Sequence, residues 1–222
     1  MQKRTKRDAL RLAVVALMAG LSFSSCLKNG DDTLVIPLPD GKIPTSVISA
    51  DLQDSLRSNG FIIYEGITPD IINGKFRAEP LILHYASDNY MNNFYPLTMT
   101  LTEQKPRGMI KYAETQRRDT VEGTAIAAQV IGHDSCFTMY CWQNLADLSE
   151  PNIDSVKLWE CKIATVISGI VTPTGFKNFQ YAYIMLEKKA QSEYYYNALA
   201  DINTFRIYYD GDSLARKIPG LN

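Results

Sequence analysis

Histidine and cysteine are scarce in this chain of 222 residues, which holds two of the first and four of the second. These residues supply most zinc ligands, and here no C-x-x-C pair occurs and His84 lies far from His133. The sequence also has no GxGxxG, P-loop, HExxH or EF-hand pattern, and no serine or cysteine in a nucleophile-elbow context. We therefore expect a protein that is not an enzyme and that holds no metal and no cofactor.

No apolar run is long enough for a membrane-spanning helix, which needs roughly 20 residues. The apolar run at 12–21 follows a basic stretch and precedes small residues that end at Cys26. Basic, apolar and small residues in this order are typical of a secretory signal. We predict a signal peptide over 1–25. A cysteine directly at the cleavage point resembles the lipobox of bacterial lipoproteins, and this resemblance implies that Cys26 carries the lipid.

Neither charge dominates the chain, whose formal net charge is −1. The predicted signal peptide holds five of the 23 basic residues and one of the 24 acidic ones, so its removal leaves a net charge of −5. A mildly acidic protein lacks the basic surface that binds nucleic acid. It is also poorly suited to direct electrostatic binding of anionic lipids. We expect no nucleic-acid partner and a membrane attachment through acyl chains on Cys26.

Residues 26–45 contain repeated prolines and glycines, which predicts an extended, lipidated tether. Leu27 follows the lipidated cysteine, where an aspartate would mark retention in the inner membrane. The acidic pair Asp31-Asp32 resembles the surface-export signal of lipoproteins from the Bacteroidetes. The resemblance implies a lipid anchor in the outer membrane of a Gram-negative bacterium, with either periplasmic or surface orientation. A merely polar linker is the alternative.

A single domain is predicted over 46–222, beginning with one short helix at 46–58. Ser46 is the expected N-cap of this helix, and Asn59-Gly60 supplies its end. After Gly60 the hydrophobic period changes from that of a helix to the period of two that is typical of strands.

The alternation is clearest at 95–102, where Tyr95, Leu97, Met99 and Leu101 share one face and threonines occupy the other. The other predicted strands, separated by turn residues, are 74–85, 109–115, 121–131, 135–145, 155–171, 176–188 and 202–209. The fold class is therefore mostly β, a single antiparallel meander. An eight-stranded barrel, which removes exposed edges, is the favoured architecture, and a two-sheet sandwich is the alternative.

Three cysteines remain besides Cys26, and exported proteins keep their disulfides. Cys141 and Cys161 are equally distant from Pro151, which lies in the predicted turn. In a symmetric hairpin these two residues face each other at a spacing that permits a disulfide. Unpaired, buried thiols are the alternative.

Tyrosines are concentrated in the last third of the chain. The run Tyr194, Tyr195 and Tyr196 cannot face inward as a whole and is the best candidate for an exposed binding surface, on which sugar rings stack. Small residues at 125, 127 and 128 leave room inside a barrel, either for a ligand cavity or for close packing.

The block at 64–76 places a G-x-x-P turn before isoleucines, a glycine and an aromatic residue. It resembles a block in uncharacterised Bacteroidetes outer-membrane lipoproteins, where it leads from a helix into the first strand, and 168–183 looks like the late hairpin of the same proteins. Gly74-Lys75-Phe76 is faintly similar to the G-x-W motif that opens lipocalin barrels. The resemblance implies a lipocalin-like barrel and supplies no catalytic residue.

Two functions are compatible with these patterns. The first is a lipid-anchored envelope protein that binds a small apolar ligand or a glycan without catalysis. The second is a structural or interaction subunit of an envelope complex with no small ligand. An apolar cavity would favour the first, and a solid interior with an exposed apolar patch would favour the second.

Overall fold

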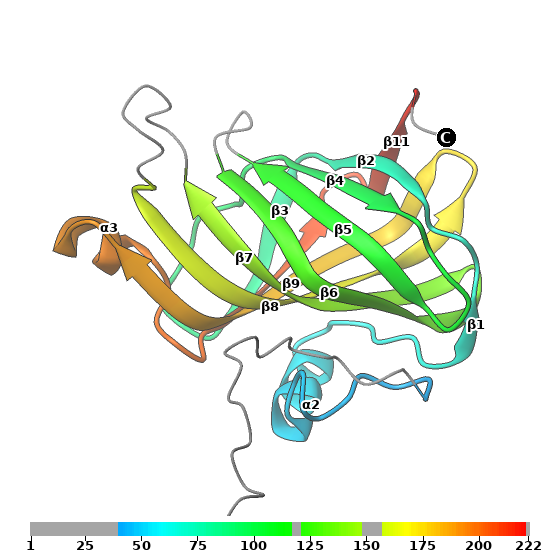
Figure 1. The fold of residues 1–222 in the computed structure, drawn as a ribbon, viewed down its shortest axis with the longest axis horizontal. Helices are drawn as coiled ribbons and strands as arrows, with labels where there is room; N and C mark the ends of the chain where they lie inside the picture. The colour runs from blue at the N-terminus through cyan, green and yellow to red at the C-terminus, as the bar shows by residue number, and fades with distance from the viewer. Residues whose placement is uncertain (1–39, 117–120, 148–156, 221–222) are drawn as a thin grey trace, which may run out of the picture. The chain divides into compact units, whose positions relative to one another are not determined.

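The structure is a computed structural model that describes residues 40–116, 121–147 and 157–220. The predicted signal peptide, Cys26 and most of the predicted tether lie outside these residues. In the described part the chain is mostly β, with two short helices, which confirms the mostly-β part of the predicted fold class. The strands form one large sheet that curls around a common interior (Figure 1).

The first described helix, α2, runs from Ala50 to Ser58 and is shorter than predicted at its N-terminus. Its N-cap is Ser49, whose hydroxyl accepts a hydrogen bond from the backbone N–H of Leu52 at 3.4 Å. The expected cap, Ser46, lies in a turn begun by Pro44, whose carbonyl accepts from the backbone N–H of residue 47. The predicted end at Asn59 agrees with the structure.

The predicted strand ranges all contain strand, with different boundaries. The range 74–85 is divided, because Pro80 has no backbone N–H for a sheet ladder. Sequence patterns missed β1, β11 and the short helix α3 (Glu193–Ala198). The strands are β1 (Ile67–Pro69), β2 (Gly74–Ala78), β3 (Leu81–Ala86), β4 (Leu97–Thr102), β5 (Met109–Gln116), β6 (Val121–Asp134), β7 (Cys136–Asp147), β8 (Trp159–Thr172), β9 (Gly175–Ala190), β10 (Phe205–Asp210) and β11 (Leu214–Ile218).

Eight strands form a closed ring of hydrogen-bonded neighbours. The order runs β11-β2-β4-β5-β6-β7-β8-β9, and the first part of β9 pairs again with β11. The later part of β9 pairs with β10, which in turn pairs with β3, so these two strands extend the sheet beyond the ring. β1 adds a short parallel pairing to the far end of β6. The strands thus belong to one sheet, not to the two sheets of a sandwich, and β2, β3 and β11 depart from a simple meander.

The sheet has an apolar core on each of its faces. One cluster takes residues from every strand of the ring and therefore fills its interior. Phe176 belongs to this cluster, with its ring 3.9 Å from that of Phe76 and 4.6 Å from that of Phe137. The second cluster covers the outer face, where Leu56 of α2 and Phe61 pack on β7–β10 (Figure 1).

The packed part of the chain begins before residue 46, the predicted start of the domain. Ile43 is buried in the outer core. Gly41 accepts a hydrogen bond from the backbone N–H of Gly66 at 2.8 Å. Gly66 has φ +132°, and a Cβ there would lie 2.5 Å from the carbonyl oxygen of Gly132. The close approach of this turn to β6 explains why the block at 64–76 carries a glycine.

Candidate functional site

A cavity of about 220 Å³ lies at the end of the ring next to α3, opposite the end where β1 pairs. Its walls come from the adjoining ends of β5–β9, from the β3–β4 connection and from the residues that follow α3. Several of its lining residues also belong to the inner core, so the cavity continues the ring interior. Most of the lining is aromatic or aliphatic and includes Phe94, Trp159, Ile163, Tyr183 and Met185.

The β3–β4 connection brings an aromatic wall to this cavity. Phe94 pairs with Leu81 in an isolated β-bridge. Its ring stacks on Tyr208, with 4.7 Å between centroids, and lies 6.0 Å from the rings of Tyr181 and Tyr183. Aromatic pairs in this range add stabilisation beyond burial alone. The segment has no strand-like alternation, which is why sequence patterns did not place it at the site.

Among the described residues that line the cavity, Arg206 is the only cation, and it is only 8% exposed. Its guanidinium donates to both carboxylate oxygens of Asp88, at 2.6 and 3.3 Å, and lies 3.6 Å from the ring centre of Tyr90. Burial alone would raise the pKa of Asp88, but the hydrogen bond and charge of Arg206 outweigh it and the pKa is lowered. The arginine is thus neutralised within the protein.

A layer of polar side chains crosses the ring interior below the cavity. Gln116, which lines the cavity, donates from Nε2 to Oε1 of Glu114 at 2.9 Å. The hydroxyl of Tyr181 donates to the same oxygen at 3.2 Å, and that of Tyr112 donates to Oε2. Burial raises the pKa of Glu114, and these donors offset only part of that effect. A buried acid therefore stays protonated to a higher pH than an exposed one.

Gly123 makes room for this layer. A Cβ at this position would lie 2.9 Å from Cγ of Glu114 and 2.7 Å from Cδ2 of Leu145, which lines the cavity. Its backbone has no positive φ, so the requirement for glycine here is one of space. Because Gly123 has no side chain, the polar side chains next to it can extend to the bottom of the cavity.

Glu114→Gln should remove a pH-dependent loss of stability. Because the folded pKa lies above the ordinary value of 4.5, the folded state binds more protons than the unfolded state above that pH, and wild-type stability falls as pH rises through this range. Glutamine cannot ionise, so the stability difference should shift in favour of the variant between pH 4 and pH 7. Urea denaturation of both proteins across this range measures it.

The comparison isolates Glu114 because other titrating groups are common to both proteins. Asp210, whose pKa burial raises to about 6, changes stability in the same direction in each of them. Parallel stability curves for wild type and Glu114→Gln would contradict the buried, protonated carboxyl.

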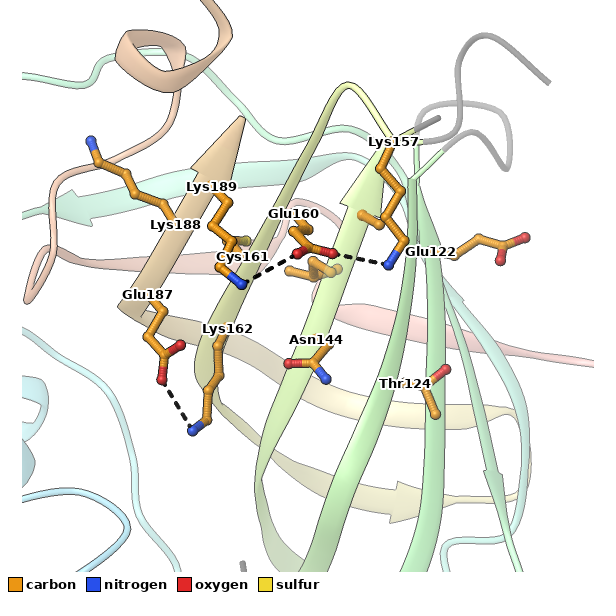
Figure 2. Close-up of a pocket in the computed structure, with 12 residues that line it drawn as sticks. Glu122, Thr124, Asn144, Lys157, Glu160, Cys161, Lys162, Glu187, Lys188 and Lys189 are labelled. Carbon is orange, nitrogen blue, oxygen red and sulfur yellow. Dashed lines mark hydrogen bonds and ion pairs between the residues drawn. The ribbon is translucent and has the colours of Figure 1, made fainter. Parts of the chain in front are cut away.

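A larger cavity of about 430 Å³ lies beside the first and is mainly charged. Figure 2 shows Lys157 and Lys189 pointing towards Glu160, with N–O distances of 2.9 and 3.7 Å. Lys162 lies 3.4 Å from Glu187 in the same view. Such exposed pairs contribute little energy, and they neutralise one another. This groove is therefore a weaker candidate for a ligand site than the smaller apolar cavity.

The three predicted surface tyrosines lie on α3. Tyr194 is 77% exposed, Tyr196 is also exposed and Tyr195 is half-buried. A helix turns about 100° per residue, so three consecutive rings do not form one flat surface. The ammonium of Lys188 lies 4.3 Å from the ring centre of Tyr196 and covers one face of it. Tyr194 is left as the most open stacking surface of the three.

The predicted pairing of Cys141 with Cys161 is wrong. Cys141 lies opposite Thr165, and Cys161 lies opposite Leu145. The register of β7 and β8 therefore offsets the two cysteines by four positions, roughly 13 Å along the strands. A disulfide needs Cα atoms within about 7 Å.

Cys136, Cys141 and Cys161 are free thiols. Burial raises the pKa of Cys161 to about 12 and that of Cys141 well above its ordinary value. Thiols of this kind are poor nucleophiles and poor metal ligands in their protonated form.

The small residues on β6 serve close packing. A register shift lies between Ala125 and Ala127, after which Ala127 packs on the outer core and Ala128 on the inner one. None of these alanines lines the cavity. Of the two explanations for this alanine-rich stretch, the structure therefore favours packing.

Among residues 40–116, 121–147 and 157–220 no group of three or more histidine, cysteine or acidic side chains is arranged to hold a metal ion. In the same residues no helix has the length and apolar character needed to cross a membrane. Comparison of the chain with family models, curated proteins and solved structures found no match.

Proposed function

We propose that this protein is a lipid-anchored, non-catalytic binding protein of the bacterial cell envelope, and that it holds a small apolar ligand in the cavity at the end of its ring. The observation that carries this proposal is the aromatic, largely apolar cavity of about 220 Å³ that continues the ring interior. Eight-stranded, lipocalin-like barrels hold one small ligand in this way, and we interpret the ring as such a barrel.

The size of the cavity limits the ligand. Drug-sized molecules occupy roughly 300–1,000 Å³, whereas an apolar cavity of about 150 Å³ holds benzene. The volume of about 220 Å³ therefore fits a single aromatic ring with a short substituent or a short alkyl chain. A glycan is less well supported. Its main stacking surface would be the single ring of Tyr194, the most open of the three tyrosines, which lies on a helix of only six residues.

A protein partner is the second candidate function, and a separate observation favours it. Ile67 and Ile71 are 71% and 70% exposed, and Ile62 in the same segment is also exposed. Large aliphatic side chains in water favour an interaction surface. If this surface binds an envelope protein, replacing Ile67 and Ile71 with serine should abolish recovery of that protein in a pull-down. The cavity variant Ala200→Leu is the control and should still recover it.

Ala200→Leu should block the cavity without disturbing the fold. Ala200 lines the cavity, so the added carbons fill empty space and should raise the free energy of unfolding by about 0.5–2 kcal/mol. Binding of isopropylbenzene, measured by ligand-observed NMR on the full-length protein in lipid nanodiscs, should weaken at least tenfold.

The matched control is Ala215→Leu. Ala215 is fully buried in the inner core but does not line the cavity. Overpacking at this position should cost about 1–3 kcal/mol of stability and leave isopropylbenzene binding unchanged in the folded fraction. Equal binding by wild type and Ala200→Leu would place the probe outside the cavity.

Cys26→Ala should release the protein from the outer membrane. The acyl chains on this cysteine are proposed to be the only strong membrane attachment, because the mature chain is mildly acidic and lacks a basic membrane-binding surface. We expect wild type in the outer-membrane fraction and the variant in the soluble fraction. A Cys26→Ala protein that still fractionates with outer membranes would contradict the lipid anchor.

A further inference from the structure

Several buried polar groups of the inner core have no hydrogen-bond partner within the described part of the chain. They are both amide atoms of Gln143, the hydroxyl of Thr165 and the hydroxyl of Tyr208. All three side chains are fully buried. A buried polar group without a hydrogen bond has lost its contact with water and gained nothing in return, and such groups are uncommon enough to need an explanation.

The position of Gln143 relates these groups to the cavity. Gln143 lies opposite Ile163 and two residues deeper along β7 than Leu145, and both of these neighbours line the cavity. A Cβ on Gly123 would meet Oε1 of Gln143 at 3.3 Å as well as the side chain of Leu145. Gln143 therefore lies directly below the cavity floor and close to Glu114.

Thr165 belongs to the same layer. It lies two residues deeper along β8 than the cavity-lining Ile163, and it pairs with Tyr183, another lining residue, on β9. Side chains two residues apart on a strand share a face. The unpartnered hydroxyl of Thr165 and the amide of Gln143 thus belong to the same inward face of β7 and β8.

We propose that the ligand of this cavity carries an uncharged polar head with both a donor and an acceptor, such as an amide, and that this head pairs with Gln143. The inference rests on the proposed function and specifies its ligand class. An amide is complementary to Gln143, which has a donor and an acceptor open. An anionic head would find no free cation among the described residues that line the cavity, because Arg206 is already paired with Asp88.

Four probes of the same shape test this. Each probe combines one benzene ring with a branched head of three heavy atoms. The head is polar and neutral in benzamide, apolar in isopropylbenzene, anionic in benzoate and cationic in benzamidinium. Their affinities are measured at pH 7 by ligand-observed NMR on the full-length protein in nanodiscs, which avoid detergent in the cavity. We expect benzamide to bind at least tenfold more tightly than each of the other three.

Two variants assign that preference to the polar layer. Gln143→Met keeps the length of the side chain and removes the amide, and it should lower benzamide affinity at least tenfold while isopropylbenzene affinity stays the same or rises. Thr165→Val removes the neighbouring hydroxyl with little change in shape and should lower benzamide affinity several-fold. It keeps the test decisive if Gln143→Met does not fold.

The outcomes separate this inference from the proposed function. If none of the four probes binds, both are overturned. If isopropylbenzene binds and Ala200→Leu blocks it, but benzamide binds no more tightly, the cavity takes an apolar ligand. The inference of a polar head is then wrong. A benzamide preference that survives both Gln143→Met and Thr165→Val also overturns the inference, and bound water would then be the partner of these groups.

Discussion

Replacing Phe176 with alanine should lower the free energy of unfolding by about 3–5 kcal/mol. Phe176 is 1% exposed and stacks on Phe76 of β2 while also contacting Phe137 of β7. It lies in the part of β9 that pairs with β11, where the ring of strands closes. Removing the phenyl ring leaves a cavity between β2, β7 and β9. Urea denaturation measures the resulting loss of stability.

Tyr194→Ala is the control for this experiment. It removes a side chain of similar size from α3, where Tyr194 is largely in solvent, so stability should change by less than about 0.5 kcal/mol. A Phe176→Ala protein as stable as Tyr194→Ala would mean that the aromatic cluster does not stabilise the closed ring of strands.

Arg206→Met should cost about 2–4 kcal/mol, the second largest effect we expect. Methionine keeps the apolar stem but leaves the partly buried carboxylate of Asp88 without its partner, and breaking a buried pair of this kind costs about 3–5 kcal/mol. Asp88 retains some contact with solvent, which lowers the expected cost. The variant should also loosen the β3–β4 connection, because Tyr90 stacks on the guanidinium.

Arg216→Met provides a matched control. Arg216 also pairs with an aspartate, Asp212, but its side chain is 65% exposed. Exposed pairs of this kind contribute about 0–1 kcal/mol, so this variant should be nearly as stable as wild type. The same chemical pair at two depths thus tests whether burial makes the Arg206 contact important, and equal losses for both variants would show that it does not.

The strands could be predicted from the sequence because their side chains alternate. In β4, Leu97, Met99 and Leu101 are buried and the threonines between them are not, as the period of two indicates. β1 and β11 are too short to show this alternation and form through pairing with distant strands. The register of β7 with β8 could not be predicted, since a proline in the sequence predicts a turn without fixing which residues pair on either side of it.

The candidate site could be predicted only in part. Arg206 and Asp88 are 118 positions apart, and no local pattern brings them together at the cavity. The polar layer did leave a signal, because Gln143 occupies an inward position of a predicted strand between the apolar inward residues Cys141 and Leu145. A polar side chain in such a position indicates either a satisfied interior network or a ligand-binding group.

The central claim is that the cavity beside α3 binds a small ligand in the cell. Wild-type protein and the Ala200→Leu variant, both purified from envelopes in parallel, can be compared by native mass spectrometry followed by identification of the released small molecules. The account predicts a small uncharged molecule at close to one per protein with wild type and none with Ala200→Leu. No bound molecule in either protein, or the same molecule at equal amounts in both, would contradict it.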